Sequence, residues 1–318
     1  MKQHELAKLC GCAPSTVSKA LRGSAGINPD TRQRILEAAE ANGITISTEQ
    51  LIRGRTVLVC APTFNNERTA RMLSRLRIAF SEMGISVVAS SWEYDSKLFA
   101  GLPHIARSIS NLCGILIFSI GFKEQTSMLT ELDVPVIFGV ACDDCDCIPT
   151  DYSVGYRAAV RHLMTNGRRR IAFIGEKQTT VKEQSFRQAM FDCGRAADER
   201  LIYRSATYST KAGAEGFTVL MRLPEPPDAI ICGYDYIALG VLNCAEAAGI
   251  TVPDELAVIG ADDIKAASTY RLGLTTLAAN QAKRVEAYIG LLLRRIKNPS
   301  APIQKITIPL ELIVRGTA

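Results

Sequence analysis

The chain has 318 residues, which at roughly 100–200 residues per domain predicts two or three domains. Hydrophobic residues make up 47% and charged residues 22%, which excludes a disordered chain, a collagen-like chain and a small disulfide-rich scaffold. The net charge is +5, of which +3 lies in residues 1–55, where eight Lys and Arg face five Asp and Glu. Any attraction to nucleic acid must therefore come from a local patch near the front of the chain.

The N-terminal residues, Met-Lys-Gln-His-Glu, contain no apolar run of signal-peptide type. No apolar segment reaches the ~18–20 residues that span a bilayer. The ten cysteines are irregularly spaced, and Cys60 and Cys232 lie in apolar segments, as small hydrophobic residues do. We therefore expect a cytoplasmic protein with reduced thiols and no membrane association.

Three short helical patterns lie in the first 43 residues. The first carries Leu6 and Leu9 on one face, and Gly11 then supplies a tight turn. The second begins at Pro14, which suits the first position of a helix because that position needs no N–H partner. The third follows Asn28, a helix-capping residue. Three short helices with a glycine turn between the first two indicate a helix-turn-helix domain.

The second helix, predicted over about residues 14–22, has a buried face and a polar face. Val17, Ala20 and Leu21 follow the i, i+3, i+4 spacing of a buried stripe. The other face carries donors and cations that suit base edges in the DNA major groove, namely Ser15, Thr16, Ser18, Lys19 and Arg22. The alternative is a small helical bundle whose outer face is merely polar.

Residues 15–23, Ser-Thr-Val-Ser-Lys-Ala-Leu-Arg-Gly, resemble the recognition helix of the lactose-repressor/galactose-repressor (LacI/GalR) family of bacterial transcription regulators. Lys19 stands where the family usually has Arg, and Arg22 replaces its common Asn. The resemblance implies that residues 44–55 form the family's interdomain hinge. It also implies that Leu51 wedges into the minor groove, which costs a few kcal/mol of unstacking, offset by contacts with a bent duplex. The usual Pro-Asn at the hinge start is absent, and Leu51 could instead pack against the following domain.

From residue 56 onward, apolar runs alternate with amphipathic stretches. Strands are predicted at residues 57–61, 86–89, 114–119 and 136–140, and in a second series at 170–175, 229–232 and 256–260. Helices are predicted near 66–83, 97–111 and 123–132, and then near 153–166, 182–194, 210–222 and 236–248. Apolar strands that alternate with helices are typical of parallel sheets covered on both faces. Two such series predict two doubly wound α/β lobes, with ligands at the carboxyl ends of their strands.

The same resemblance continues through the second lobe. Residues 151–155, 167–175, 259–263 and 311–315 are similar to segments of the family. They imply a periplasmic-binding-protein-like core in which the chain crosses between lobes three times. The predicted domains are a helix-turn-helix domain over 1–43, a hinge over 44–55, an N-terminal lobe over 56–150 with 279–305, and a C-terminal lobe over 151–278 with 306–318.

The resemblance also implies a small-molecule effector between the lobes. Carried over by position, the expected contacts are Phe64, Phe118, Tyr152, Lys182, Tyr234 and Asp262. Lys182 stands at the family's effector-binding Arg, and both tyrosines replace Asn. A site rich in aromatic rings predicts a planar or amphipathic effector that stacks on Tyr or Phe, with an anionic group at Lys182. The alternative is a sugar held by stacking and backbone groups.

One short segment carries three thiols and three carboxylates, Cys142-Asp-Asp-Cys145-Asp-Cys147. Thiolates at such spacing could bind zinc or act as a redox switch. No second Cys/His cluster lies nearby in sequence to complete four ligands, so we favour an exposed acidic loop and predict no metal and no cofactor.

The predicted function is a transcription regulator, most simply a repressor, that binds a palindromic double-stranded operator as a homodimer and responds to an effector. Two other classes stay open: a solute-binding sensor without operator activity, and a sugar- or nucleotide-processing enzyme on the same fold. The sensor would need an export signal, and it leaves residues 1–43 unexplained. The enzyme lacks a Gly-x-Gly-x-x-Gly motif after a strand, a phosphate loop and a His-Glu-x-x-His motif, so we predict no enzymatic activity.

Overall fold

The computed structural model describes residues 2–21, 27–44, 52–119, 127–177 and 180–318. The chain forms two compact units. Unit 1 contains Met1–Pro149 and Gln281–Thr307, and unit 2 contains Thr150–Asn280 and Ile308–Ala318. Within the described ranges, no helix is both long and apolar enough to cross a membrane.

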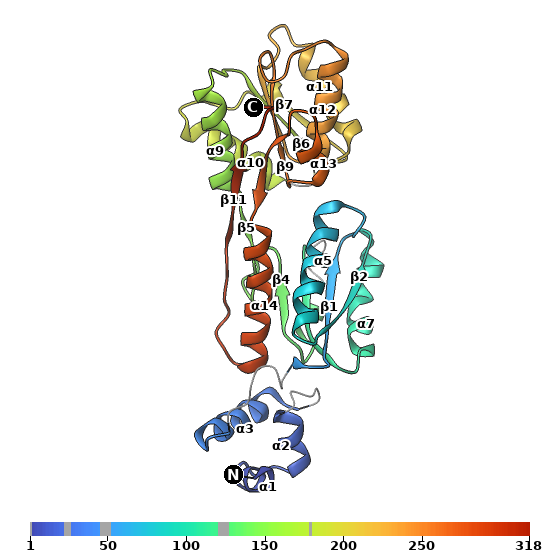
Figure 1. Cartoon of the computed structure of the whole chain (residues 1–318), viewed down its shortest axis with the longest axis vertical. Coiled ribbons are helices and arrows are strands. Elements are labelled where there is room, and N and C mark those ends of the chain that lie inside the picture. The colour runs from blue at the N-terminus through green and yellow to red at the C-terminus, as the bar shows by residue number, and fades with distance from the viewer. Residues whose placement is uncertain (1, 22–26, 45–51, 120–126, 178–179) are drawn as a thin grey trace. The chain divides into compact units, whose positions relative to one another are not determined.

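Unit 1 begins with three short helices, α1 (Gln3–Leu9), α2 (Pro14–Leu21) and α3 (Pro29–Ala41), drawn in dark blue in Figure 1. Gly11 has a φ of +59° in the turn between α1 and α2, a conformation that glycine adopts without strain. Asn28 caps α3, since its side-chain oxygen accepts hydrogen bonds from the amides of Asp30 and Thr31. The predicted helix-turn-helix arrangement is therefore confirmed.

The three helices enclose a small core in which Leu6, Val17, Ala20, Ile35 and Ala39 have no exposed surface. The predicted pairing of Leu6 with Leu9 is wrong in part. The Leu9 side chain is 59% exposed, because Ala7 and Cys10 follow Leu6 into the core instead.

The remainder of unit 1 is a parallel four-stranded sheet of order β2-β1-β3-β4. Its strands are β1 (Thr56–Ala61), β2 (Ser86–Ser91), β3 (Leu112–Ile117) and β4 (Val136–Phe138). The helices are α5 (Glu67–Glu82), α6 (Ser96–Ala100), α7 (Leu102–Ser108), α8 (Ser127–Thr130) and α14 (Gln281–Lys297). All residues of β1 and β3 are buried, whereas β2 lies at the sheet edge and is largely exposed.

The single helix predicted near residues 97–111 is wrong. The chain forms α6 and α7 instead, and Gly101 serves both as the last cap of α6 and as the first cap of α7. Pro103 then stands in the first turn of α7, where its missing N–H costs no hydrogen bond. Only the part of the predicted helix at 123–132 from residue 127 onward lies within the described residues.

Unit 2 is built on a seven-stranded sheet of order β5-β11-β10-β9-β8-β6-β7. Its strands are β5 (Thr150–Asp151), β6 (Ile171–Glu176), β7 (Ile202–Ser205), β8 (Ala229–Cys232), β9 (Ala257–Ala261), β10 (Thr275–Ala279) and β11 (Ile308–Ile313). Its helices are α9 (Tyr152–Thr165), α10 (Thr180–Asp192), the short 3-10 helix η2 (Glu199–Leu201), α11 (Thr210–Met221), α12 (Asp235–Ala247) and α13 (Lys265–Thr269). All neighbouring strands run parallel except β10 and β11.

Both sheets follow the doubly wound pattern that the sequence predicts. In unit 1 the chain passes from β1 outward to β2 and then returns to β3 on the other side of β1. In unit 2 it passes from β6 to β7 and then to β8 on the other side of β6. A doubly wound sheet binds its ligand where the strand order reverses, at the carboxyl ends of the strands. Those positions follow β1 and β3 in unit 1 and β6 and β8 in unit 2.

Close contact between α11 and α12 depends on glycine. A Cβ atom on Gly240 would lie 2.0 Å from the carbonyl oxygen of Thr210, and one on Gly213 would lie 2.0 Å from that of Ile237. Backbone atoms of packed helices cannot move aside as a flexible side chain can. Gly290 in α14 is the opposite case, because it is exposed and no atom would lie within 4 Å of an added Cβ.

We expect Gly240→Ala to lower the free energy of unfolding by ~1–3 kcal/mol, the usual cost of overpacking. The matched change Gly290→Ala should raise it by ~0.5–1 kcal/mol, because alanine loses less backbone entropy in a helix. Urea unfolding followed by circular dichroism measures both. Equal effects of the two substitutions would contradict the close helix contact.

Candidate functional site

The outer face of α2 presents the residues predicted to contact DNA. Ser15 and Lys19 are exposed, and Thr16 and Ser18 are half-buried. Val17 and Ala20 on the opposite face anchor the helix in the core, so the polar face is held outward. This face carries three hydroxyl groups and one ammonium group, which can donate hydrogen bonds to base edges and to phosphates. Arg22 and Leu51, the other two predicted contacts, lie outside the described residues.

At the strand-order reversal of unit 1, two of the predicted effector residues meet. The rings of Phe64, after β1, and Phe118, directly after β3, form an edge-to-face pair with centroids 6.2 Å apart. Phe118 also lies 5.8 Å from the ring of Tyr288 on α14. Tyr288 is buried, and burial raises the pKa of its hydroxyl to about 12, so this phenol stays neutral. Sequence reasoning missed Tyr288 because it lies far from both strands in the chain.

At the reversal of unit 2, Lys182 and Tyr234 meet. The Lys182 side chain is almost fully buried, and its ammonium group lies 3.4 Å from the centroid of the Tyr234 ring. The same ammonium donates to the carbonyl oxygen of Gly233, 2.6 Å away. The Tyr234 hydroxyl in turn donates to Glu176 at the end of β6, 3.2 Å away, and its ring packs beside Tyr208. A desolvated cation on an aromatic face is a favourable arrangement for a ligand with an anionic or planar group.

Sequence reasoning did not select Glu176 or Tyr208. A signal for Glu176 was present, because it ends the predicted strand at 170–175, where ligand groups of a parallel sheet are expected. Tyr208 follows a strand that the sequence analysis did not predict, so nothing pointed to it.

The buried hydroxyl of Tyr156 lies near the remaining predicted residues. Tyr156 has no exposed surface, and among the described residues its hydroxyl has no hydrogen-bond partner. Burial raises its pKa well above the usual value, and the nearby groups of Tyr152, Tyr234 and Asp262 raise it further. A buried hydroxyl without a partner in the described part of the chain is a position where a bound ligand can supply the hydrogen bond.

Asp262 is held in an unusual backbone conformation directly after β9. Its φ is +112°, and its amide donates to the carbonyl of Leu277 on the neighbouring strand, 2.8 Å away. A non-glycine residue in such a conformation costs on the order of 1–3 kcal/mol and is typical of functional positions.

A second acid, Asp235, is buried beside this strand end. It accepts hydrogen bonds from the Thr276 hydroxyl at 2.6 Å and from the Ile264 amide at 2.9 Å. Burial nevertheless dominates and, together with the charge of Asp262, raises the Asp235 pKa to about 7. The folded protein therefore binds a proton at Asp235 that the unfolded chain, with a carboxyl pKa near 3.9, has already released.

This difference predicts a pH dependence of stability. Between about pH 4 and pH 7 the folded state holds one proton more at Asp235, so the free energy of unfolding should fall as pH rises, by at most ~1.4 kcal/mol per pH unit. Asp235→Asn keeps one oxygen to accept from the Ile264 amide, and its NH2 group can donate to the Thr276 hydroxyl; because the amide does not titrate, this component should disappear. Urea unfolding of both proteins across this range measures the difference, and parallel pH profiles would contradict the shift.

The prediction of an exposed acidic loop at the cysteine-rich segment is wrong in part: Asp143 and Asp144 are exposed, but the residues after them are not. Cys145, Asp146 and Cys147 are buried, and the Cys147 thiol donates to the carbonyl of Cys142. Burial raises the pKa of Cys145 to about 12, which keeps it as a thiol rather than the thiolate that metals and oxidants require. Within the described part of the chain, no three His, Cys, Asp or Glu side chains are placed to bind a metal ion together.

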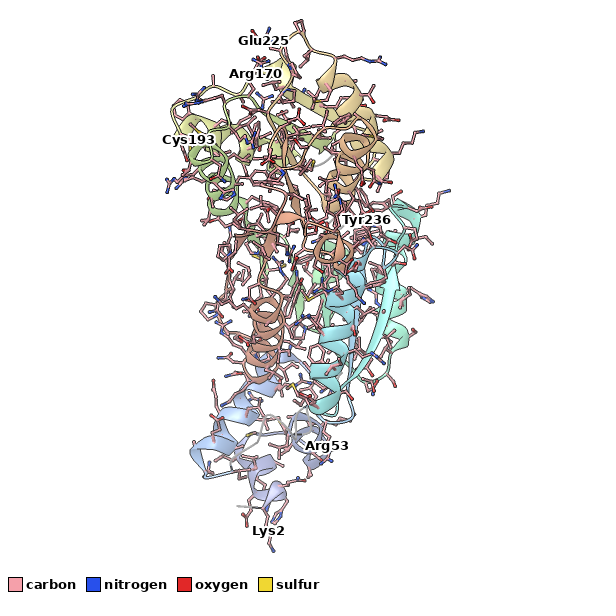
Figure 2. The ribbon with its side chains drawn as sticks, turned by 45° about the horizontal axis from the view of Figure 1, so that its top comes forward. Lys2, Arg53, Arg170, Cys193, Glu225 and Tyr236 are labelled. Carbon is pink, nitrogen blue, oxygen red and sulfur yellow. The ribbon has the colours of Figure 1, made fainter. Side chains whose placement is uncertain are left out.

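The arginines at 168–170 are engaged in local structure. Arg168 donates to the carbonyls of Pro253 and Asp254, and Arg170 forms an ion pair of 3.1 Å with Glu225. Figure 2 labels Arg170 and Glu225 on the same part of unit 2. These contacts hold the basic run against neighbouring segments of unit 2.

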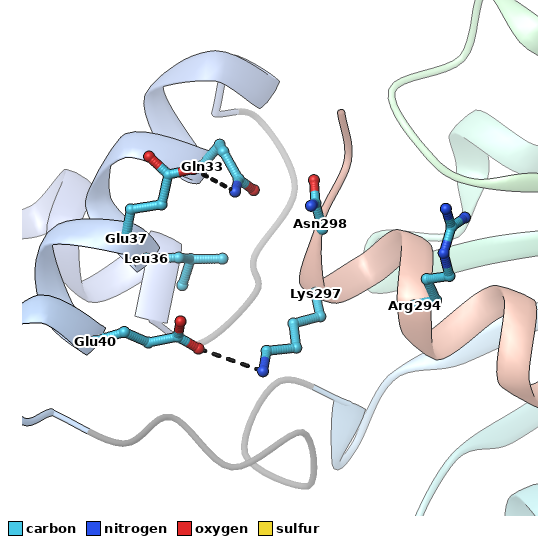
Figure 3. A pocket seen from close by; sticks show the side chains of 7 residues that line it. All are labelled: Gln33, Leu36, Glu37, Glu40, Arg294, Lys297 and Asn298. Carbon is cyan, nitrogen blue, oxygen red and sulfur yellow. Dashed lines mark hydrogen bonds and ion pairs between the residues drawn. The ribbon is translucent and has the colours of Figure 1, made fainter. Parts of the chain in front are cut away.

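In unit 1, helix α3 faces the end of α14 across a pocket of about 260 Å³ (Figure 3). Glu40 on α3 and Lys297 on α14 form an ion pair of 3.3 Å. Leu36 lines the same pocket and is almost fully buried. Both charged partners are more than half exposed, so the pair contributes ~0–1 kcal/mol.

Comparison with known proteins gives the class of this fold. A family model described as a periplasmic binding protein-like domain matches residues 160–318, half of the chain. Among solved structures, a complex of the transcriptional regulator CelR with cellobiose has a TM-score of 0.73 and 24% identity, with full coverage of both chains. A LacI family transcriptional regulator from Lactobacillus casei with bound sucrose has a TM-score of 0.71 and 21% identity, over 83% of this chain and 99% of that one. The fold is thus a periplasmic-binding-protein-like core preceded by a helix-turn-helix domain.

Relatives that align over nearly the whole chain identify the family within this class. The HTH-type transcriptional regulator DegA of Bacillus subtilis is 28% identical over 331 aligned positions, covering 98% of this chain and 96% of its own. The HTH-type transcriptional repressor PurR of Mannheimia succiniciproducens is 24% identical, with the same coverage. The chain belongs to the LacI/GalR family of transcription regulators, as the sequence resemblance predicts.

Proposed function

We propose that this protein is a repressor that binds a palindromic operator as a homodimer, and that a small-molecule effector raises or lowers its affinity for this operator. The exposed polar face of α2 supports operator binding most directly, because it carries Ser15 and Lys19 on a helix whose other face is fixed in a core. One such helix reads only a few base pairs, so specific binding requires two copies. The site of action is then the cytoplasm, where operator DNA lies.

The proposed function assigns a role to each part of the chain. Residues 1–43 bind DNA, residues 44–55 form the hinge, and the rest forms two effector-binding lobes. Arg22 extends the recognition surface of α2, and Leu51 enters the minor groove. Binding of effector and binding of operator are then reciprocally coupled, since each changes the affinity for the other by the same factor.

For the effector we propose a planar or amphipathic metabolite with an anionic group. The support is the buried ammonium of Lys182 over the Tyr234 ring, together with the aromatic pair of Phe64 and Phe118. The Tyr156 hydroxyl, near Tyr152 and Asp262, offers a hydrogen bond that is unused within the described residues. The solved relatives named above hold cellobiose and sucrose, so a sugar is the alternative outcome.

Selection from a pool of random duplexes tests the regulator directly. The purified full chain is titrated by fluorescence anisotropy at several salt concentrations, and the bound DNA is sequenced. Recovery of one palindrome is the expected result. Weak, sequence-independent binding, both with and without a metabolite extract, would instead favour a solute-binding sensor without operator activity.

We expect Lys182→Met to weaken the binding of an anionic effector at least tenfold, because a hydrogen bond to a charged group contributes ~1.5–3 kcal/mol. Methionine keeps the length and the buried apolar stem of the side chain. Lys177→Met is the matched control, since Lys177 is exposed near the end of β6. Thermal-shift screening of acidic and neutral metabolites against the three proteins gives the comparison, and a neutral sugar that binds all three equally would overturn the anionic class.

A further inference from the structure

Unit 1 contains a second pocket, of about 310 Å³, that is separate from the residues considered so far. Its wall comes from several parts of the unit, which include the start of α3, the residue before β1, the start of β3, the segment 130–135 and the end of α14. Ligand pockets in proteins have volumes of ~300–1,000 Å³, so this one has room for a small organic molecule.

Arg55 forms the basic part of this pocket. Its side chain lines the pocket although the residue is only 8% exposed. One guanidinium nitrogen donates to the carbonyl of Leu112 at 3.2 Å. Among the described residues, no carboxylate lies within 4.0 Å of this guanidinium. A buried cation without an ionic partner is costly, and a bound anion would offset that cost.

A second guanidinium faces the same pocket. Arg32 of α3 lines it, and both burial and the charge of Arg55 lower the Arg32 pKa, with Asp133 opposing them. Asp133 and Glu131 are exposed, and they are the acids that line this pocket. Arg295 also lines the pocket, but its charge is balanced by Asp146. Arg55 and Arg32 therefore place two mutually interacting guanidinium groups at this pocket.

Most of the remaining wall is apolar. It includes Ile27, Leu132, Val134, Pro135 and Ile296. A pocket with basic groups in one region and aliphatic surface around them suits a ligand that carries an anionic group on a small apolar body. The anionic group would pair with the guanidinium groups, and the apolar body would pack against the aliphatic side chains.

We propose that this pocket binds a small organic anion, a carboxylate or a phosphate monoester with an apolar body, whose anionic group pairs with Arg55 and Arg32. The site is distinct from the proposed effector residues and does not depend on DNA binding. Ile27 and Arg32 belong to the N-terminal helical part of unit 1, and Arg55 directly precedes β1, so a ligand there contacts both the helical part and the sheet-bearing part of unit 1.

Isothermal titration of the full-length protein without DNA tests the site. Phenyl phosphate and benzoate are the probes for the two anionic groups, inorganic phosphate tests the head alone, and benzyl alcohol tests the apolar body alone. We expect saturable binding of at least one aromatic anion, at least tenfold tighter than that of benzyl alcohol or inorganic phosphate. The tighter of the two aromatic anions identifies the preferred anionic group.

Arg55→Gln should weaken that binding at least tenfold, whereas Arg53→Gln, which removes the same charge from an exposed position two residues away, should leave it unchanged. Because Arg55 is buried, its replacement could impair folding, so Thr130→Glu provides a second variant. Thr130 is an exposed residue of the pocket wall, and a carboxylate there should compete with the ligand for the arginines. Unchanged binding in Thr130→Glu, or no saturable binding of either aromatic anion to the unaltered protein, overturns the proposal.

Discussion

Asp146→Ala is expected to lower the free energy of unfolding by ~3–5 kcal/mol, because it leaves a largely buried guanidinium without its partner. Asp146 accepts two hydrogen bonds from Arg295, at 2.9 and 3.0 Å, and a third from the amide of Gln304 at 2.7 Å. Arg295 also donates to the carbonyls of Pro299 and Ala301. One carboxylate thus joins the cysteine-rich segment to the end of α14 and to the segment that follows it.

Glu40→Ala is the matched control in the same unit. It breaks the ion pair with Lys297, whose partners are both more than half exposed, and should change the free energy of unfolding by ~1 kcal/mol or less. Asp146→Asn should fall between the two variants, since an amide keeps an acceptor but not the charge. Urea unfolding of unaltered and variant proteins gives all four values. A loss for Asp146→Ala no larger than that for Glu40→Ala would show that the buried pair contributes little.

Much of the fold could be predicted because each local pattern agrees with its tertiary surroundings. The apolar run at 229–232 is strand β8 over the same residues, and every residue of it is buried. Strands β5, β7, β10 and β11 were not predicted. β11 alternates buried and exposed positions and contains Pro309, so it lacks the continuous apolar character of the other strands. Its pairing with β10, 30 or more positions away, is what makes it a strand.

The candidate site was less accessible to sequence reasoning. Phe118 and Tyr234 were selected because the family resemblance places effector contacts at their positions. Which side chains then meet is decided in three dimensions: Lys182 turns onto the Tyr234 ring, and Tyr288 reaches Phe118 from a distant helix. Asp146 shows the same limit, because its partner Arg295 lies 149 positions away and nothing local distinguishes it from an exposed acid.

Lys19→Ala is expected to lower the affinity for the selected operator by about tenfold or more and to relax the preference at one base pair in each half-site. The reason is the position of Lys19, which is exposed on the polar face of α2, one helical turn after Ser15. A lysine at this place can donate to the acceptor edge of guanine, and such a contact discriminates against other bases by ~1–3 kcal/mol. Anisotropy titrations against the operator and against single-base variants of it measure both effects.

The dependence on salt separates this role from simple charge attraction. If Lys19 contacted only a phosphate, its removal would weaken binding to all sequences alike and reduce the slope of log affinity against log salt by ~0.9. If Lys19 contacts a base, its removal lowers the discrimination between base pairs at one operator position. Lys211→Ala removes the same charge from an exposed lysine of unit 2 and should leave both quantities unchanged. Undiminished operator affinity in Lys19→Ala would contradict the assignment of α2 as the recognition helix, because Lys19 is the one cation on its described polar face.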